Sequence, residues 1–297
     1  MELITCEKNN LFQLPMKYFE GESLDNKIAL GKRFTFILIE TGTGIAEINN
    51  RKVPFISPVV FCINEKEHII INDCNTKIKA IFFHPSIINC ELNFENVRRL
   101  PEDASVTLLQ DSYITKFFIN RNEKFIGKIN VGPLTVKNFS LLCDSFNNES
   151  NKQYREHWPC RSRSYIMELL FLCEKIYIND NNIEVISNEI DDDINSVLIY
   201  IYNNYSKKIT ISELTKKFNI NRTTLSKKFN EFVGESIITY LNKIRVNMAS
   251  IMLRDTGLPV SEIMERVGFL DSAHFLRTFK SYMKMTPTEY REKYCWL

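Results

Sequence analysis

The last third of the chain contains an internal repeat, and this repeat constrains the fold more than any other feature of the sequence. Residues 211–218 (ISELTKKF) match residues 260–267 (VSEIMERV) at an offset of 49. Residues 225–229 (LSKKF) match residues 275–279 (FLRTF) at an offset of 50, because the second copy has one extra residue in its turn. Since a fixed period indicates a repeated structural unit, we expect two copies of one small helical unit.

Each copy is predicted to consist of two helices joined by a tight turn. Thr210 and Glu213 form the Thr-x-x-Glu pattern of a capping box at the start of the first helix. Asn221 and Asp271 are good N-caps for the second helices of the two units. Between the units, apolar residues at helical spacing predict one long helix over residues 237–254. The repeat therefore predicts a pair of helix-turn-helix units held by a connecting helix.

In a helix-turn-helix unit the second helix enters a major groove of DNA. The second helices are expected at about 221–233 and 271–283, and two such helices on a rigid connector could reach grooves about 34 Å apart. Small, polar and basic side chains on their outward faces are the predicted base contacts: Arg222, Thr223, Ser226, Lys227, Ser272, Ala273, His274 and Arg277. Arg277 is the strongest of these, because a guanidinium can donate two hydrogen bonds to one guanine.

Five further cations are predicted phosphate contacts: Lys228, Lys243, Arg245, Lys280 and Lys284. A solvated helix face explains any one of them equally well. The charge distribution supports a polyanionic partner, because the net charge of +2 is the sum of an acidic first part and a basic last part of the chain. Residues 1–193 carry a net charge of −5, with 22 basic and 27 acidic side chains, whereas residues 194–297 carry +7, with 16 and 9. Together with the repeat, this basic excess indicates double-stranded DNA as the partner.

The first hundred residues have a different pattern. Short β-branched and aromatic runs separated by turn residues predict strands near 34–39, 45–48, 59–63, 69–71 and 78–83. This spacing is typical of a small antiparallel barrel or sandwich, and an up-and-down meander is the competing topology. Helical spacing then appears over 134–146 and 161–178. The expected fold class is α+β, with a β-barrel and its helices followed by an all-α domain.

The predicted helix 161–178 has a broad apolar stripe formed by Ile166, Leu169, Leu170, Cys173 and Tyr177. Two interpretations are equally good: the stripe packs on the barrel, or it pairs with a second copy of the chain in a homodimer. The polar segment that follows places a domain boundary within 179–194. We divide the chain into a sensor and dimerisation domain, 1–185, and a DNA-binding domain, 186–297.

Several classes of protein are disfavoured by the sequence. No apolar run approaches the roughly 18–20 residues of a membrane span, and the N-terminus lacks a secretory signal. The eight cysteines are far apart, so we expect reduced thiols in a cytoplasmic protein. Only four histidines occur, without a His-x-His pattern, so we expect no metal and no cofactor. An enzyme built on the barrel is the alternative class, but neither a metal triad nor a clustered acid and base appears.

Residues 209–290 resemble the DNA-binding domain of the AraC/XylS family of bacterial transcription regulators. Three segments carry the resemblance: 260–269 (VSEIMERVGF), 272–280 (SAHFLRTFK) and 285–291 (MTPTEYR). Met264 and Lys284 are small departures, since a small residue and a glycine are usual there. The resemblance implies one recognition helix in each half. It also implies base contacts at Thr223, Ser226, Lys227, His274 and Arg277.

The N-terminal region is similar, more weakly, to the cupin-like sensor domain of the same family. Residues 42–44 (GTG), 50–51 (NR) and 82–85 (FFHP) fit that outline. The family resemblance implies control by a small-molecule effector or a regulatory protein, dimerisation through the 161–178 helix, an activator role and contact with RNA polymerase. Metal-binding cupins use a His-x-His pattern that this chain lacks. A ligand pocket or a purely structural barrel is therefore expected in place of an enzyme.

Overall fold

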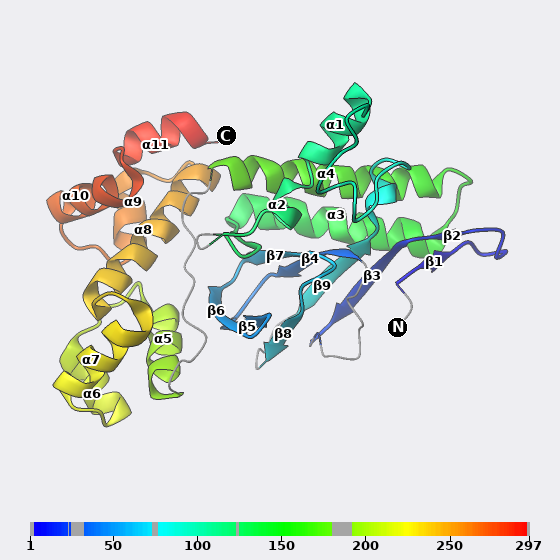
Figure 1. Ribbon diagram of the computed structural model, residues 1–297. Coiled ribbons are helices and arrows are strands. Elements are labelled where there is room, and N and C mark those ends of the chain that lie inside the picture. Colours follow the sequence, from blue (N-terminus) through cyan, green and yellow to red (C-terminus); the bar gives the residue numbers. More distant parts are fainter. Residues whose placement is uncertain are drawn as a thin grey trace.

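The computed structural model of the protein describes residues 3–22, 24, 33–72, 77–122, 125–179 and 192–295. A part built of sheets and helices is followed by a wholly helical part, as Figure 1 shows. The architecture is therefore α+β, as predicted. The expected boundary between residues 185 and 186 lies outside the described residues.

Two antiparallel sheets form the framework of the first part. The larger has the strand order β10-β7-β4-β9-β3, with β3 at Met16–Gly21, β4 at Phe34–Ile39, β7 at Val59–Ile63, β9 at Ile78–Phe83 and β10 at Lys128–Asn130. The smaller has the order β6-β5-β8, with β5 at Thr43–Ile48, β6 at Arg51–Ile56 and β8 at Ile69–Asn72. A separate hairpin joins β1, Thr5–Cys6, to β2, Gln13–Leu14. Because β4 pairs with β7 and β9 and not with β5, the strands are not ordered as a meander.

Strand β4 shows why these segments form buried strands. Successive side chains of a strand point to opposite faces of the sheet. Ile37 and Ile39 pack in the core between the two sheets, whereas Phe36 and Leu38 pack in a second core under the helices. All six residues of β4 are buried, because both faces of the larger sheet are covered. The β-branched and aromatic run that predicted this strand, polar only at Thr35, is typical of such two-sided burial.

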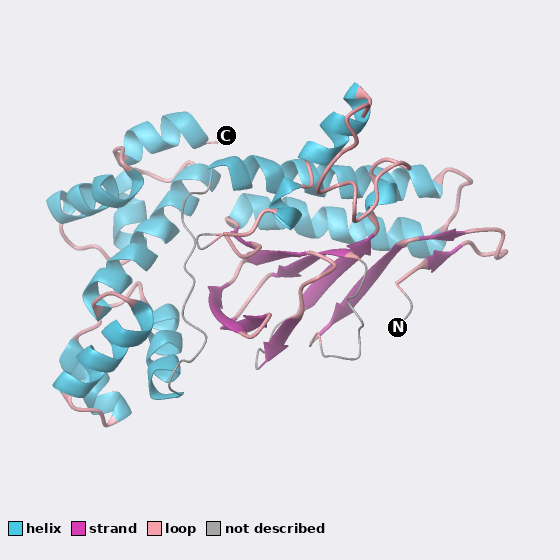
Figure 2. Cartoon of the chain, viewed as in Figure 1, coloured by secondary structure: helices cyan, strands magenta, loops and turns pink. Residues whose placement is uncertain are grey.

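Helices α3, Pro133–Lys152, and α4, Trp158–Asn179, cover the outer face of the larger sheet (Figure 2). The predicted dimerisation residues need correction here. Ile166, Leu169, Leu170 and Cys173 have no exposed surface and pack in the core beneath the helices. Tyr177 is partly buried against Phe125 and Phe117. The stripe therefore packs on the sheet, which leaves a different face of α4 for any second copy.

Three short helices precede this pair: η1, Pro85–Ile87; α1, Val106–Tyr113; and α2, Lys116–Ile119. The second part contains α5, Asp192–Asn204; α6, Ile211–Phe218; α7, Arg222–Val233; α8, Ile237–Asp255; α9, Val260–Arg266; α10, Ser272–Met283; and α11, Pro287–Tyr294. In the described parts of the chain, no helix has the length and apolar character to cross a membrane. No group of three or more potential metal ligands is placed together there either.

Helix α8 contributes to two hydrophobic cores. Tyr240 and Ile244 pack with α5, α6 and α7, whereas Val246 and Leu253 pack with α9, α10 and α11. Each core belongs to one helix-turn-helix unit, and α8 contributes side chains to both cores. The predicted repeat is therefore a repeat of tertiary structure.

Among the described residues, hydrogen bonds join the two parts at both ends of their contact. Thr43 on β5 donates its hydroxyl proton to the side-chain oxygen of Asn203 on α5, with 2.5 Å between the oxygens. At the other end of the contact, the carboxylate of Asp255 on α8 accepts the hydroxyl proton of Thr135 on α3, with an oxygen–oxygen distance of 2.7 Å. Asp255 is also paired with Arg254 at 2.8 Å, and both side chains are buried. A buried ion pair thus lies where α8 meets α3.

Candidate nucleic-acid interface

The first helix-turn-helix unit is held by caps at both helix starts. The Thr210 hydroxyl accepts the backbone N–H of Glu213, as the capping-box pattern predicted. The Glu213 carboxylate does not return the bond, because it accepts the hydroxyl proton of Tyr200 at 2.6 Å. Asn221 caps α7 by accepting the backbone N–H of Thr224 at 2.8 Å. Helix α7 therefore begins at the predicted residue.

The second unit repeats this plan with a tighter turn. Gly268 has a φ of +92°, a conformation that suits glycine. A Cβ at this position would lie 2.7 Å from the carbonyl oxygen of Ser206, so the turn also needs the absence of a side chain. Asp271 then accepts the backbone N–H of His274 at 2.6 Å and starts α10. Both recognition helices thus have the bounds that the sequence predicted.

The outward face of α7 presents the predicted base contacts. Leu225 and Phe229 are fully buried and fix the inner face of the helix. Four exposed residues occupy the outer face: Arg222, Thr223, Ser226 and Lys227. Lys227 lies 3.9 Å from Glu231 in an exposed pair, and such a pair costs little to break. The helix therefore offers two cations flanking two hydroxyls to a groove.

Helix α10 presents its predicted residues in the same way. Phe275 and Phe279 are buried, and Ser272, Ala273, His274 and Arg277 are all exposed. The Arg277 Nε donates to the carbonyl oxygen of Ala273 at 3.3 Å. The His274 ring packs edge-on against Phe269, with 5.4 Å between ring centroids. These contacts restrain the side chains of Arg277 and His274, two of the predicted base contacts.

The spacing of the two helices is set by α8. This helix has 19 residues, which corresponds to a length of about 28 Å. Figure 1 shows α7 and α10 on the side of the helical part that faces away from the sheets. The Tyr282 hydroxyl on α10 donates to the carbonyl oxygen of Thr239 on α8 at 3.3 Å. This hydrogen bond joins α10 to the long helix α8. Engagement of two successive major grooves remains a prediction.

The predicted phosphate contacts fall into two groups. Lys280 and Lys284 are exposed, at and just after the last turn of α10. Lys228 and Lys243 are half-buried and paired with acidic side chains, with Lys228 3.5 Å from Asp193 and Lys243 3.3 Å from Glu235. The second group can reach phosphate only after exchanging a partner.

Arg245 differs from the other four predicted phosphate contacts. Its guanidinium donates to the carbonyl oxygens of Tyr205 and Lys207 at 2.8 and 2.7 Å. It also lies 5.7 Å from the ring of Phe269 in the second unit. Burial lowers the pKa of Arg245 below its ordinary value. The geometry favours a structural bracket between the two units over a phosphate contact.

Residues 214–293 match the family model described as a helix-turn-helix domain. The lactose operon transcription activator of Staphylococcus xylosus is 29% identical over 130 residues, which cover 44% of this chain and 46% of the relative. The Msm operon regulatory protein of Streptococcus mutans is 30% identical over 100 residues, covering 34% of this chain and 36% of the relative. Residues 214–293 therefore form a helix-turn-helix domain of the AraC/XylS type.

A solved structure is also similar to part of this chain. The C-terminal domain of a two-component response regulator from Fusobacterium nucleatum is 31% identical, with a TM-score of 0.33. The match covers 34% of this chain and 99% of that one. The chain spans less than half the length of the curated relatives it matches. The similarity to these relatives therefore concerns the helical domain.

One exposed side chain on the outer face of α10 was missed by the sequence reasoning. Leu276 is 45% exposed on the outer side of α10, next to Arg277. The offset of 50 pairs it with Ser226 in the first unit, which was predicted as a base contact. Selection by polarity excluded this leucine, although apolar groups also contact the thymine methyl group. An alignment of the two repeats is therefore sufficient to identify Leu276 as a candidate base contact.

Proposed function

We propose that this protein is an AraC-type transcription regulator that activates transcription by placing α7 and α10 in two successive major grooves. The observation that carries the proposal is the shared geometry of the two units. Each has a capped second helix with an exposed polar and basic outer face and a buried apolar inner face. The basic excess of residues 194–297 favours the phosphate backbone. An activator role, with RNA polymerase as a partner, is supported by the relative named as a lactose operon transcription activator.

The proposed regulator acts as a homodimer through the outer faces of α3 and α4. Leu141 on α3 is 55% exposed and Phe171 on α4 is 53% exposed, and both border a hollow between the two helices. Glu168 and Lys175 border the same hollow. These two charges are equally spaced in sequence about Phe171 and Leu172. In an antiparallel pairing of two α4 helices across a two-fold axis, each glutamate meets the lysine of the other copy.

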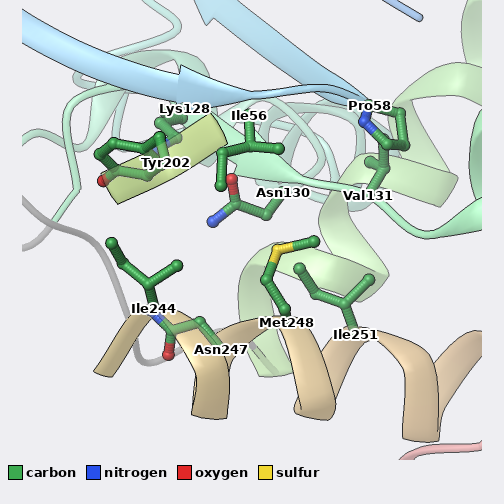
Figure 3. A pocket seen from close by; sticks show the side chains of 10 residues that line it. All are labelled: Ile56, Pro58, Lys128, Asn130, Val131, Tyr202, Ile244, Asn247, Met248 and Ile251. Carbon is green, nitrogen blue, oxygen red and sulfur yellow. The ribbon is translucent and has the colours of Figure 1, made fainter. Parts of the chain in front are cut away.

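We further propose that the first part of the chain acts as a sensor that controls this DNA binding. The buried Arg254–Asp255 pair supports the proposal, because it joins the connector helix α8 to the sensor helix α3. A change in the sensor can therefore reach the helix that holds both reading helices. A slot between the two parts, bordered by Ile56, Tyr202 and Met248 (Figure 3), favours a small effector over a regulatory protein.

Base recognition by Arg277 provides the test of the proposed function. Duplex DNA is selected from a randomised library with the full-length protein, and the bound sequences are compared with those selected by Arg277→Ala. The variant should lose about 1–3 kcal/mol of binding to the preferred duplex and relax the preference at one guanine. The measurement is a titration of the selected duplex at fixed salt, followed by the same titration with that base pair changed.

Arg266→Ala is the matched control for this experiment. Arg266 is an exposed arginine of the same unit, on α9, and is paired with Glu262 at 2.7 Å. Its loss removes the same charge without touching a reading helix, so any weakening should be equal for all duplexes. If Arg277→Ala selected the same sequences as the parent protein, the assignment of α10 as a recognition helix would be wrong.

A further inference from the structure

Two apolar side chains lie on the outer face of α10, among the residues predicted to contact bases. Ala273 and Leu276 are both exposed, and 45% of the surface of Leu276 is accessible. They are three residues apart, so they are neighbours on one side of the helix. Phe275 and Phe279 pack in the core beneath α10, and the exposed side chains point away from that core. Ala273 and Leu276 therefore form a small hydrocarbon surface between polar and basic neighbours.

This hydrocarbon surface lies directly beside Arg277, the predicted guanine contact. Because an α-helix has about 3.6 residues per turn, Ala273 and Leu276 lie on one side of Arg277, and His274 lies on the other. The Arg277 Nε donates to the carbonyl oxygen of Ala273 at 3.3 Å, so the arginine side chain runs back along the helix toward Ala273. The base pair within reach of the hydrocarbon surface is therefore a neighbour of the guanine.

The first unit has hydroxyl groups at the two equivalent positions. The offset of 50 pairs Ala273 with Thr223 and Leu276 with Ser226. Residues 225–230 and 275–280 have the same pattern of buried and exposed side chains, so the two helices present these positions in the same way. A serine or threonine hydroxyl can form hydrogen bonds to several base edges, whereas an apolar side chain contacts the methyl group of thymine. The two helices are therefore expected to prefer different base pairs.

The chemistry of the major groove identifies the base that suits an apolar contact. The methyl group of thymine projects into this groove, and it is the apolar group that distinguishes one base from the others there. Cytosine presents an amino donor at the corresponding edge, and neither alanine nor leucine has a side-chain acceptor for it. The free energy of covering one methyl group corresponds to about a fourfold change in affinity. A thymine is therefore the favoured base beside Leu276.

We propose that Leu276, with Ala273 beside it, contacts the methyl group of a thymine next to the guanine that Arg277 contacts. The proposal rests on the proposed function, and it names the base pairs that the second unit selects. Because Ser226 offers a hydroxyl at the equivalent position, this contact belongs to α10 and not to α7. The thymine therefore determines which half of the DNA site α10 occupies, and with it the direction in which the protein lies on the duplex.

Replacement of thymidine by deoxyuridine provides the test, because deoxyuridine pairs in the same way and lacks only the methyl group. The full-length protein first selects its preferred duplex, and the guanine whose preference is lost in Arg277→Ala locates the half-site of α10. Each thymine of that half-site is then replaced in turn by deoxyuridine, and the duplexes are titrated at fixed salt. One replacement, next to the guanine, should weaken binding about fourfold.

The same duplexes are then titrated with Leu276→Ala, which completes a double-mutant cycle between the side chain and the methyl group. This variant should bind the thymine duplex more weakly than the parent protein, and it should no longer distinguish thymine from uracil at that position. Leu109→Ala is the matched control, because Leu109 is a leucine of similar exposure, 39%, on α1 in the first part of the chain. The control should keep the parent's preference for thymine.

The possible outcomes separate this inference from the proposed function. If Arg277→Ala lost the guanine preference and no deoxyuridine replacement weakened binding, the proposed function would stand and the thymine contact would be wrong. Equal sensitivity to deoxyuridine in the parent protein and in Leu276→Ala would also overturn the contact, because another group would then sense the methyl. Failure of the protein to select any duplex would refute both.

Discussion

At the residue scale, α7 and α10 are followed by different residue types, although the two helix-turn-helix units repeat one fold. The C-cap residue is Gly234 after α7 and Lys284 after α10, and both residues are left-handed, with φ of +80° and +62°. Glycine adopts this conformation freely, whereas a lysine is strained by its Cβ. We therefore expect Lys284→Gly to raise the free energy of unfolding by about 1 kcal/mol. Urea unfolding of the full-length protein measures the change.

The opposite exchange is its matched control. Nothing lies within 4 Å of a Cβ placed at Gly234, so the site has room for a side chain and only the backbone opposes it. We expect Gly234→Lys to lower the free energy of unfolding by about as much as Lys284→Gly raises it. Equal stability of all three proteins would show that the backbone conformation is not the source of the difference.

At the element scale, helix α3 begins with a cap from another part of the chain. Gly132 at its N-cap has no side chain to accept the first backbone N–H groups, and α3 has no acidic residue in its first turn. Asp255 of α8 takes this place, accepting the hydroxyl proton of Thr135 at 2.7 Å and lying 3.4 Å from its backbone nitrogen. A carboxylate at a helix N-terminus is stabilised by the helix dipole. A Cβ at Gly132 would overlap this carboxylate, which explains the glycine.

Thr135→Val tests this contact between the elements. Valine keeps the shape and removes the hydroxyl donor, so we expect a loss of about 1 kcal/mol in stability. Hydrogen exchange should rise at the start of α3 and at the end of α8 together, because the bond joins them. Thr115→Val is the control, since the Thr115 hydroxyl donates locally to the carbonyl oxygen of Ser112. Faster exchange in α3 alone would contradict a coupling through Asp255.

Local patterns predicted the elements better than they predicted the contacts. The strand 34–39 and the starts of α7 and α10 were correct, because two-sided burial and N-caps are written in neighbouring residues. Strands β3 (MKYFEG) and β10 (KIN) were missed, since Lys17 and Glu20 interrupt the first, the second is short, and their pairing partners lie far along the chain. A local pattern likewise identifies Arg254 and Asp255 as charged, but not as buried against α3.

The same limit applied to the candidate site and to α4. Periodicity identified the apolar stripe of α4 without identifying what covers it, and the sheet covers it. Polarity selected the exposed residues of both reading helices correctly. It could not separate Arg245, whose carbonyl acceptors belong to the loop after α5, from cations that face solvent. Long-range contacts decide these cases, and a local sequence pattern does not contain them.

At the scale of the whole molecule, the proposed dimer depends on the outer face of α3 and α4. Phe171 is the centre of this face, with Leu141 beside it across the hollow. A carboxylate at its centre would be desolvated on pairing, which is costly without a counter-ion. We therefore expect Phe171→Asp to shift the mass in light scattering from twice 34.9 kDa to 34.9 kDa. Val106→Asp, at a position on α1 that is 71% exposed, should leave the mass unchanged.

The ion pairs expected across this dimer, between Glu168 of one copy and Lys175 of the other, can be tested separately. If α4 pairs antiparallel about Phe171 and Leu172, Glu168→Lys places two lysines against each other at both ends of the interface and weakens it. Lys175→Glu creates the opposite repulsion, and the double variant restores the pairing with its charges exchanged. Light scattering of the three proteins at low salt therefore distinguishes this geometry from any other arrangement. A double variant that stayed as dissociated as either single variant would contradict the antiparallel pairing of α4.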